Sequence, residues 1–247
     1  MKSIKTMLKI EGKLSIRDMN MCIFAIIMPL VILVILGIIY TDKEAFEGAG
    51  YSFIEQSFGA LSTIAICAGG LMGLPIVISD YRERKILKRF KVTPVSPMTI
   101  LFVQLLIYTI YSIVSVLLLW GVSKIFFNFK FRGSFFMFLG GWFLVLISIL
   151  SIGMLVGGVA KNSKQASVIA SVLYFPMLIF SGATLPYEVM PSTLQKVSDF
   201  MPLTQGIKIL KAASLNLALE NIVVSIIIMV FISLLCILCS IKFFKWE

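Results

Sequence analysis

The sequence predicts an all-α membrane protein with six transmembrane helices, on three observations. The 247 residues have a mean hydropathy of +1.02, 59% of them are hydrophobic and only 14% are charged. These values lie outside the range of soluble domains. The apolar residues form six stretches, each close to the roughly 20 residues that cross a bilayer core. Basic residues gather between alternate stretches. The six stretches cover residues 22–39, 58–79, 100–122, 135–159, 166–185 and 222–241.

Each apolar stretch is expected to be a helix, because unpaired backbone amides cost several kcal/mol in hydrocarbon. Six spans leave too few of the 247 residues for a separate soluble domain of ordinary size. We therefore expect residues 1–247 to form a single transmembrane domain. The net charge of +10 does not imply a nucleic-acid partner, since basic residues that flank spans face the lipid surface.

The distribution of Lys and Arg predicts the orientation of the spans. Of the 22 basic residues, 15 lie before the first stretch, between the second and third, between the fourth and fifth, or after the sixth. By the positive-inside rule, both termini are expected to be cytoplasmic, in a multi-pass protein of the cell (inner) membrane. One loop opposes this count, because it would place three basic residues outside. These are Lys124, Lys130 and Arg132.

Residues 1–21 are predicted to form an amphipathic helix at the membrane surface. Its apolar face would hold Ile4, Met7, Leu8 and Leu14, with cationic residues on the other faces. A frayed basic tail is the alternative.

The loop 80–97 is predicted to contain a short cytoplasmic helix with one apolar face. That face would carry Tyr81, Ile86, Leu87 and Phe90. Thr93 and Pro94 would end the helix, since a residue before proline disfavours helical geometry. The alternative is a basic loop that binds lipid. Charged residues would surround the apolar face, namely Arg82, Glu83, Arg84, Lys85, Lys88 and Arg89.

The residues in the spans argue against catalysis and proton coupling within this chain. The chain contains no histidine, no paired carboxylates within the spans and no G-x-x-x-x-G-K-[ST] phosphate loop. Cys236 and Cys239 form a C-x-x-C pair without two further metal ligands in view. We therefore expect no enzyme activity, no metal site and no bound cofactor, with energy supplied by a partner.

Glycine pairs and alternating aromatics suggest local packing. Gly69 and Gly73 in the second stretch, and Gly153 and Gly157 in the fourth, form G-x-x-x-G pairs, which favour packing within the chain over a dimer seam. The phenylalanines of 127–131 alternate with Lys130 and Arg132, which predicts an outer-surface segment.

Two groups of motifs resemble the ABC-2 type transporter permeases. The first runs from Arg82-Glu83-Arg84 through Leu87-Lys88-Arg89-Phe90 to Thr93-Pro94-Val95-Ser96. Many members carry glycine where this chain has Lys85. The second group follows the family order between its fifth and sixth spans. It comprises Pro176, Ser181-Gly182, Leu185-Pro186, Met190-Pro191 and Met201-Pro202-Leu203.

The resemblance implies a permease subunit of an ATP-driven exporter. Two permease chains would pair, and separate ATP-binding cassette subunits would bind ATP and Mg and hydrolyse the ATP. Segment 182–221 would form an outer re-entrant pair of helices. Spans two and five would line the path for an amphipathic cargo such as a drug, antibiotic, peptide or lipid. The coupling helix would consist of Arg82, Glu83, Arg84, Leu87, Lys88, Arg89 and Phe90, ended by Thr93 and Pro94, and the path residues would be Ser62, Thr63, Ser171 and Tyr174.

Two other functions stay open on the sequence. One is a non-transporting membrane scaffold or an immunity protein that binds a toxic peptide. The other is an ion-coupled carrier.

Overall fold

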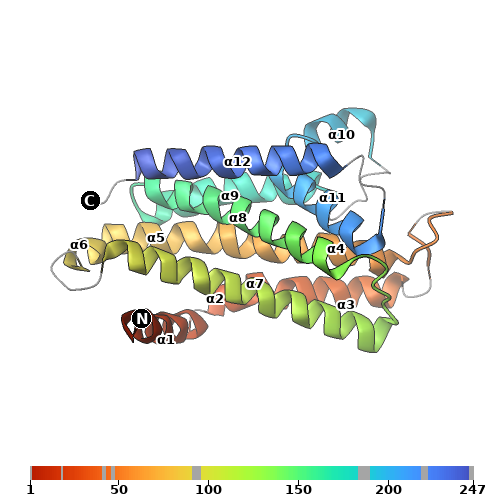
Figure 1. Ribbon diagram of the computed structural model, residues 1–247, viewed down its shortest axis with the longest axis horizontal. Helices are drawn as coiled ribbons and strands as arrows, with labels where there is room; N and C mark the ends of the chain where they lie inside the picture. Colours follow the sequence, from red (N-terminus) through yellow and green to blue (C-terminus); the bar gives the residue numbers. More distant parts are fainter. Residues whose placement is uncertain are drawn as a thin grey trace.

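Six long helices pack side by side into one bundle, and a further helix, α1, lies across it near one end (Figure 1). The structure is a computed structural model. It describes residues 2–17, 19–40, 43–45, 48–90, 96–182, 190–217 and 222–244. Within these residues there is no β-strand, and a single isolated antiparallel bridge joins Glu44 to Ser52. The all-α class with six membrane-crossing helices is confirmed.

The helices that are long and apolar enough to cross a bilayer are Ile23–Tyr40, Phe53–Glu83, Met98–Phe127, Phe135–Val159, Ser163–Phe180 and Ile222–Phe243. The segments of the first two, in chain order, are α2 (Met19–Cys22), a π-helical turn (Ile23–Ile27), α3 (Met28–Tyr40), α4 (Phe53–Cys67), a second π-helical turn (Ala68–Gly73) and α5 (Leu74–Glu83). The other long helices are α7 (Pro97–Phe127), α8 (Phe135–Val159), α9 (Ser163–Phe180) and α12 (Ile222–Phe243). The short helices are α1 (Lys2–Arg17), α6 (Ile86–Phe90), α10 (Ser192–Ser198) and α11 (Pro202–Leu215).

The second span is longer at both ends than the predicted 58–79. It begins at Phe53 because Ser52 and Glu55 form a capping box, in which Ser52 Oγ accepts from the Glu55 N–H at 3.1 Å and Glu55 Oε2 accepts from the Ser52 N–H at 3.0 Å. It continues to Glu83, through residues that the sequence assigns to a loop. The fifth span ends at Phe180, not at 185, and residues 183–189 lie outside the described part of the chain.

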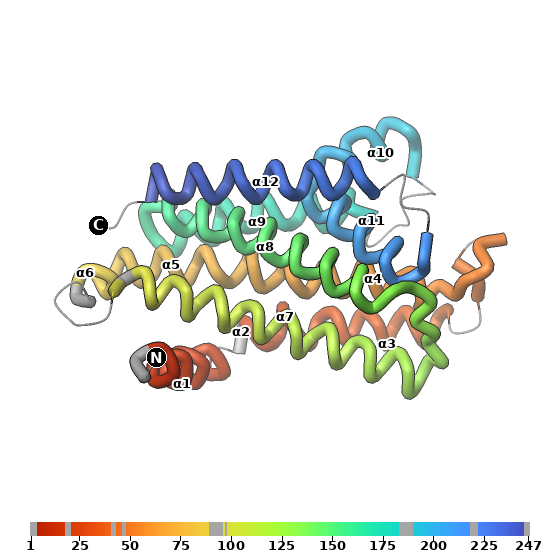
Figure 2. Tube along the Cα trace, viewed as in Figure 1, coloured from red at the N-terminus to blue at the C-terminus, as the bar shows by residue number. Residues whose placement is uncertain are grey.

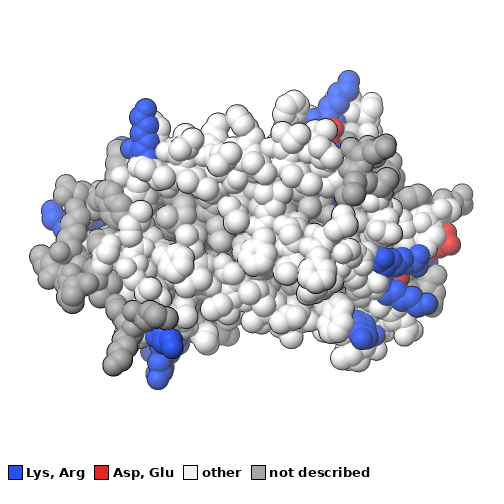
Figure 3. All heavy atoms as spheres, in the orientation of Figure 1, with Lys and Arg blue, Asp and Glu red and all other residues white. Residues whose placement is uncertain are grey.

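The connections lie alternately at two ends of the bundle. We call one the α6 end, because it holds α6, α1, the start of α9 and the end of α12 (Figure 2). The other, the α10 end, holds α10, residues 43–45, residues 48–52 and residues 128–134. Figure 3 shows Lys and Arg at the two ends of the visible face and a belt without charged side chains between them. This distribution is that of a bundle that crosses a membrane lengthwise.

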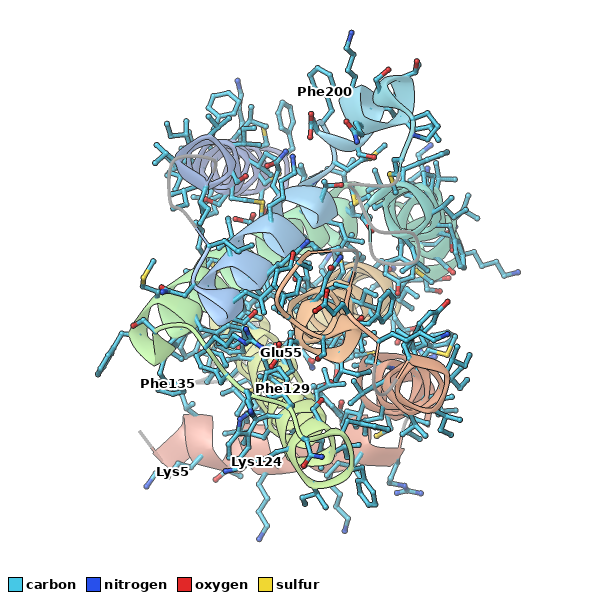
Figure 4. All side chains as sticks on the ribbon, turned by 90° about the vertical axis from the view of Figure 1, so that its right-hand side faces the viewer. Lys5, Glu55, Lys124, Phe129, Phe135 and Phe200 are labelled. Carbon is cyan, nitrogen blue, oxygen red and sulfur yellow. The ribbon has the colours of Figure 1, made fainter. Side chains whose placement is uncertain are left out.

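Helix α1 runs across the bundle axis, as Figure 4 shows from the α10 end. Met7 is buried, and Ile4 and Leu8 pack against the core beside it. Leu14, which the sequence places on the same apolar face, is 52% exposed. Of the predicted apolar face, Ile4, Met7 and Leu8 therefore contact the bundle, and Leu14 does not share their burial.

Segment 182–221 contains α10 and α11, while residues 183–189 and 218–221 lie outside the described part of the chain. Helix α11 is buried along almost its whole length and packs against α4, α8 and α12. A Cβ at Gly59 would lie 2.7 Å from the backbone nitrogen of Lys211, so this glycine allows α11 to touch the backbone of α4. The N–H groups of Arg132 and Gly133 donate to Ser214 O at 3.1 and 2.9 Å and pair the carbonyl end of α11.

The loop between α7 and α8 is held at the α10 end by an ion pair. Arg132 Nη2 lies 3.0 Å from Glu55 Oε2, whose side chain is only 4% exposed. Phe129 is buried against Phe58, with ring centroids 4.7 Å apart, and lies beside Glu55 in Figure 4. The prediction of an outer-surface segment is therefore wrong for Phe129, because the loop folds inward over the start of α4.

The residues of the two glycine pairs differ in how closely another helix approaches them. A Cβ at Gly153 would overlap the carbonyl oxygen of Gly70, and one at Gly157 would lie 2.9 Å from Ile78 Cβ. At Gly73 it would overlap the side chain of Met21, whereas at Gly69 its nearest neighbour, Tyr108 Cδ1, would be 3.6 Å away. Three of the four residues thus permit close contacts within the chain.

We expect Gly153→Ala to lower the free energy of unfolding by about 1–3 kcal/mol, because the backbone of Gly70 cannot yield to the added methyl group. The matched control is Gly140→Ala on the same helix, where nothing lies within 4 Å of the new Cβ. Unfolding of both variants in a detergent titration gives the comparison. Equal stability of the two would contradict the packing described here.

Candidate functional site

Three consecutive residues at the end of α5 bind four different helices. Tyr81, Arg82 and Glu83 precede α6 directly, and each side chain leaves α5 in a different direction. We call these three residues the α5 hub. Their hydrogen-bond partners are distant in the sequence. Gln104 is 23 positions from Tyr81, and the other partners are 70 to 80 positions from the hub residue that they bind.

Tyr81 connects α5 to α1 and α7. Its hydroxyl donates to Glu11 Oε2 of α1. Gln104 Nε2 of α7 donates to the same carboxylate oxygen at 2.9 Å and approaches the Tyr81 hydroxyl at 3.4 Å. A second contact lies further along α1, where Ser15 Oγ donates to Tyr111 Oη at 3.1 Å. The hydrogen bonds from Tyr81 and Gln104 have the Glu11 carboxylate as acceptor, so they are stronger than hydrogen bonds between neutral groups.

Arg82 connects α5 to the end of α8. Its Nη1 donates to Gly157 O at 2.9 Å and to Ala160 O at 2.7 Å, and the side chain is buried. These carbonyls lie in the last turn of α8, where no further helical N–H can reach them and the helix dipole favours a cation. The guanidinium carbon also lies 5.8 Å from the ring centroid of Phe244, just after α12.

Glu83 connects α5 to the start of α9. One carboxylate oxygen accepts from both the backbone N–H and the hydroxyl of Ser163, each at 3.0 Å. Ser163 is the first residue of α9, and an anion is favourable at a helix N-terminus. Glu83 and Asn162 thus pair different N–H groups in the first turn of α9. Glu83 accepts from the Ser163 N–H, and Asn162 Oδ1 accepts from the Gln165 N–H at 2.8 Å.

Lys85 makes the break between α5 and α6. Its φ of +57° is in the left-handed region, and the Lys85 N–H donates to Arg82 O at 2.9 Å. Glycine adopts this conformation without strain. Lys85 therefore adopts the left-handed backbone conformation that suits the glycine found at this position in many members of the family. In α6, Leu87 is buried while Lys88 is exposed.

The structure places some of the predicted coupling residues at the end of α5 and others in α6. Arg82 and Glu83 belong to α5 and bind other helices of this chain, so they do not surround a separate amphipathic helix as the sequence pattern suggested. Arg84 ends α5 and pairs with Asp80 at 2.9 Å. Residues 86–90 form α6, while Thr93 and Pro94 lie outside the described part of the chain. The motif alone gives no signal for the hub, because every partner is distant in sequence.

The predicted path residues lie inside this chain. Ser62 and Thr63 are fully buried, and their hydroxyls donate to Phe58 O and Gly59 O of their own helix at 2.7 and 2.8 Å. Tyr174 is buried on α9 and Ser171 is half-buried. Their role in a path stays a prediction. Within the described residues, no group of three His, Cys, Asp or Glu side chains is placed to hold a metal ion.

The sequence profile of ABC-2 type transporters matches residues 2–215, which include the hub, α6 and α11. The chain belongs to the ABC-2 type transporter family. The predicted resemblance is thereby confirmed.

Curated relatives of this ABC-2 chain carry transport names. It is 26% identical over 136 residues to the inner membrane transport permease YhhJ of Escherichia coli (strain K12), covering 53% of this chain and 35% of YhhJ. It is 24% identical over 153 residues to the probable multidrug ABC transporter permease YbhS of the same strain, covering 60% and 40%. Nodulation protein J of Rhizobium leguminosarum bv. viciae is 26% identical over 76 residues, covering 31% and 29%. The matched region thus spans less than half of each relative.

Within this ABC-2 chain, the hub joins the end of α5 to α1, α7, α8 and α9, directly before α6. We expect Tyr81→Phe to speed hydrogen exchange of the α1 amides about tenfold, because loss of one charge-assisted hydrogen bond weakens the hold on α1 by roughly 1.4 kcal/mol or more. Tyr40→Phe is the control, since it removes a hydroxyl at the α10 end and keeps the ring stack on Phe53. Unchanged exchange in Tyr81→Phe would show that Glu11 is held without this residue.

Proposed function

We propose that this chain is the permease subunit of an ATP-driven exporter. It forms the path with a second permease chain, and separate ATP-binding cassette subunits supply the energy. The observation that carries the proposal is the α5 hub, which connects α6 to α1, α7, α8 and α9 in a chain of the ABC-2 family. A scaffold does not require such a transmission point. The sequence has no phosphate-binding loop of its own, so ATP and Mg belong to the partner subunits.

In this proposal the α6 end faces the cytoplasm. The 15 basic residues counted on that side of the predicted topology support the orientation. In the opposing loop 128–134, the charge of Arg132 is balanced by Glu55, which weakens the objection from that loop. Helix α1 then lies in the head-group region, and α11 enters the membrane from the outside as one member of a re-entrant pair.

Helix α6 presents its polar side to the ATPase in this proposal. Leu87 anchors α6 to the bundle, while Lys88 is exposed and Arg89 and Phe90 follow it in the helix. When the ATPase moves α6, the hub passes the motion to the starts and ends of the neighbouring helices. The cargo is amphipathic in this proposal, because the spans supply mainly apolar and hydroxyl groups.

We expect Arg89→Glu and Phe90→Ala to leave membrane insertion intact but to lower cargo-stimulated ATP hydrolysis about tenfold or more, because they change the surface that meets the ATPase. Affinity purification in mild detergent, with a search for an ATP-binding cassette subunit in the purified material, measures association, and hydrolysis is then assayed in the complex.

The control is Lys130→Glu, an equal reversal of charge at an exposed site of the α10 end. Normal export and normal co-purification of both α6 variants would remove α6 from the ATPase contact. Transport that stops with uncouplers and ignores ATP would instead identify an ion-coupled carrier.

A further inference from the structure

Helix α1 carries a row of lysines on the side that faces away from the bundle. Lys5, Lys9 and Lys13 follow one another at intervals of four residues, which places them along one side of the helix. All three are exposed, and none of them forms an ion pair with a described residue. Figure 4 shows Lys5 directed away from the other helices. We call these three residues the lysine face.

The contacts on the opposite side of α1 fix the direction in which the lysine face points. Met7 is buried against the bundle. Glu11 accepts hydrogen bonds from Tyr81 of α5 and from Gln104 of α7. Two positions along a helix correspond to a rotation of about 200°, so Lys9 lies opposite both Met7 and Glu11. Because α1 packs sideways against α7, the lysine face points away from the bundle axis and not toward the α6 end.

The lysine face lies at the depth where the membrane-spanning helices begin or end. Tyr81, which binds α1, is two residues before the end of α5. Glu83, at that end, binds the first residue of α9, so the two spans meet at the same level. Spans end at the headgroup layer of a bilayer. Lipids that surround the bundle therefore place their headgroups beside the lysine face.

Exposed apolar side chains lie next to the lysines on α1. Ile10 and Leu14 are 54% and 52% exposed, and Ile16 is 66% exposed. A soluble anion gains nothing from these side chains, whereas a phospholipid offers an anionic phosphate together with acyl chains. The combination of cationic and apolar side chains on one exposed surface therefore favours a lipid over a soluble ligand.

We propose that the lysine face of α1 binds anionic phospholipids in preference to zwitterionic ones. A lysine near an anionic membrane surface strengthens binding about fivefold, so three lysines give roughly 100-fold. A location at the membrane surface does not by itself require this selectivity, since apolar side chains bind any lipid. The proposal concerns lipid binding by this chain alone, so it holds or fails independently of ATP-driven export.

The test is native mass spectrometry of the full chain in neutral detergent, titrated with phosphatidylglycerol or with phosphatidylcholine of the same acyl chains. We expect the anionic phosphatidylglycerol to bind roughly 100-fold more tightly than the zwitterionic phosphatidylcholine. A rise in ionic strength is expected to reduce this preference, because salt screens exposed charges. Glycerol 1-phosphate, which carries a phosphate without acyl chains, is expected to bind far more weakly than the lipid, and it separates a lipid ligand from a soluble anion.

Two matched triple variants assign the binding to the lysine face. Lys5→Gln, Lys9→Gln and Lys13→Gln together remove three charges and keep good helix formers, so we expect phosphatidylglycerol to bind about 100-fold more weakly, close to phosphatidylcholine. The control removes the same number of exposed lysines at the α10 end and is expected to leave the binding unchanged. It combines Lys124→Gln, Lys130→Gln and Lys196→Gln.

Thermal unfolding without added lipid shows whether both triple variants fold. If the α1 triple variant does not, the single variant Lys9→Gln decides, with an expected loss of about fivefold. Equal binding of phosphatidylglycerol and phosphatidylcholine overturns the proposal, as does equal weakening by the two triple variants. Binding of glycerol 1-phosphate as tight as that of the lipid also overturns it. So does unchanged lipid binding in the α1 triple variant, and if that variant instead loses association with an ATP-binding cassette subunit, the lysine face contacts a protein.

Discussion

The bundle depends on the pairing of helix ends by groups from other segments. A backbone carbonyl or N–H that is buried away from water needs a partner within the protein, and an unpaired group costs several kcal/mol in hydrocarbon. Arg82 pairs the last carbonyls of α8, and Glu83 pairs the first N–H of α9. The same rule operates at the α10 end, where the N–H groups of Arg132 and Gly133 pair the end of α11. Charged and loop residues thus add fixed points at the helix ends to the close packing between the spans.

Hydropathy predicts the six spans well because the requirement for helix in lipid is local. It fails where a charged residue has a distant partner. Residues 80–83 look like a loop by charge, yet they continue α5, because the carboxylate of Glu11 is offered to Tyr81 and the carbonyls of Gly157 and Ala160 are offered to Arg82. Glu55 is similar, since its burial depends on Ser52 nearby and on Arg132 far along the chain. No single-sequence pattern contains these pairings.

Helix α11 shows the same limit for the candidate site. Its 14 residues with two lysines are too short and too polar for hydropathy to predict a span, and only the family resemblance implies a re-entrant pair of helices there. The burial of this helix rests on Gly59 of α4, which shows no motif of its own because its contact is Lys211 of a different helix. The position of α6, in contrast, follows from the motif and the proline beyond it. The sequence thus locates α6, and only the three-dimensional structure reveals the hub that precedes it.

The left-handed Lys85 has a consequence for how force travels through the junction of α5 and α6. A glycine there would let the two helices swivel over a wide range of φ and ψ, and part of any push on α6 would be absorbed in the joint. A lysine in that conformation has a small allowed region around φ +57°. The junction of α5 and α6 is therefore stiffer than a glycine junction, and under the proposed function a displacement of α6 would reach α5 with little loss.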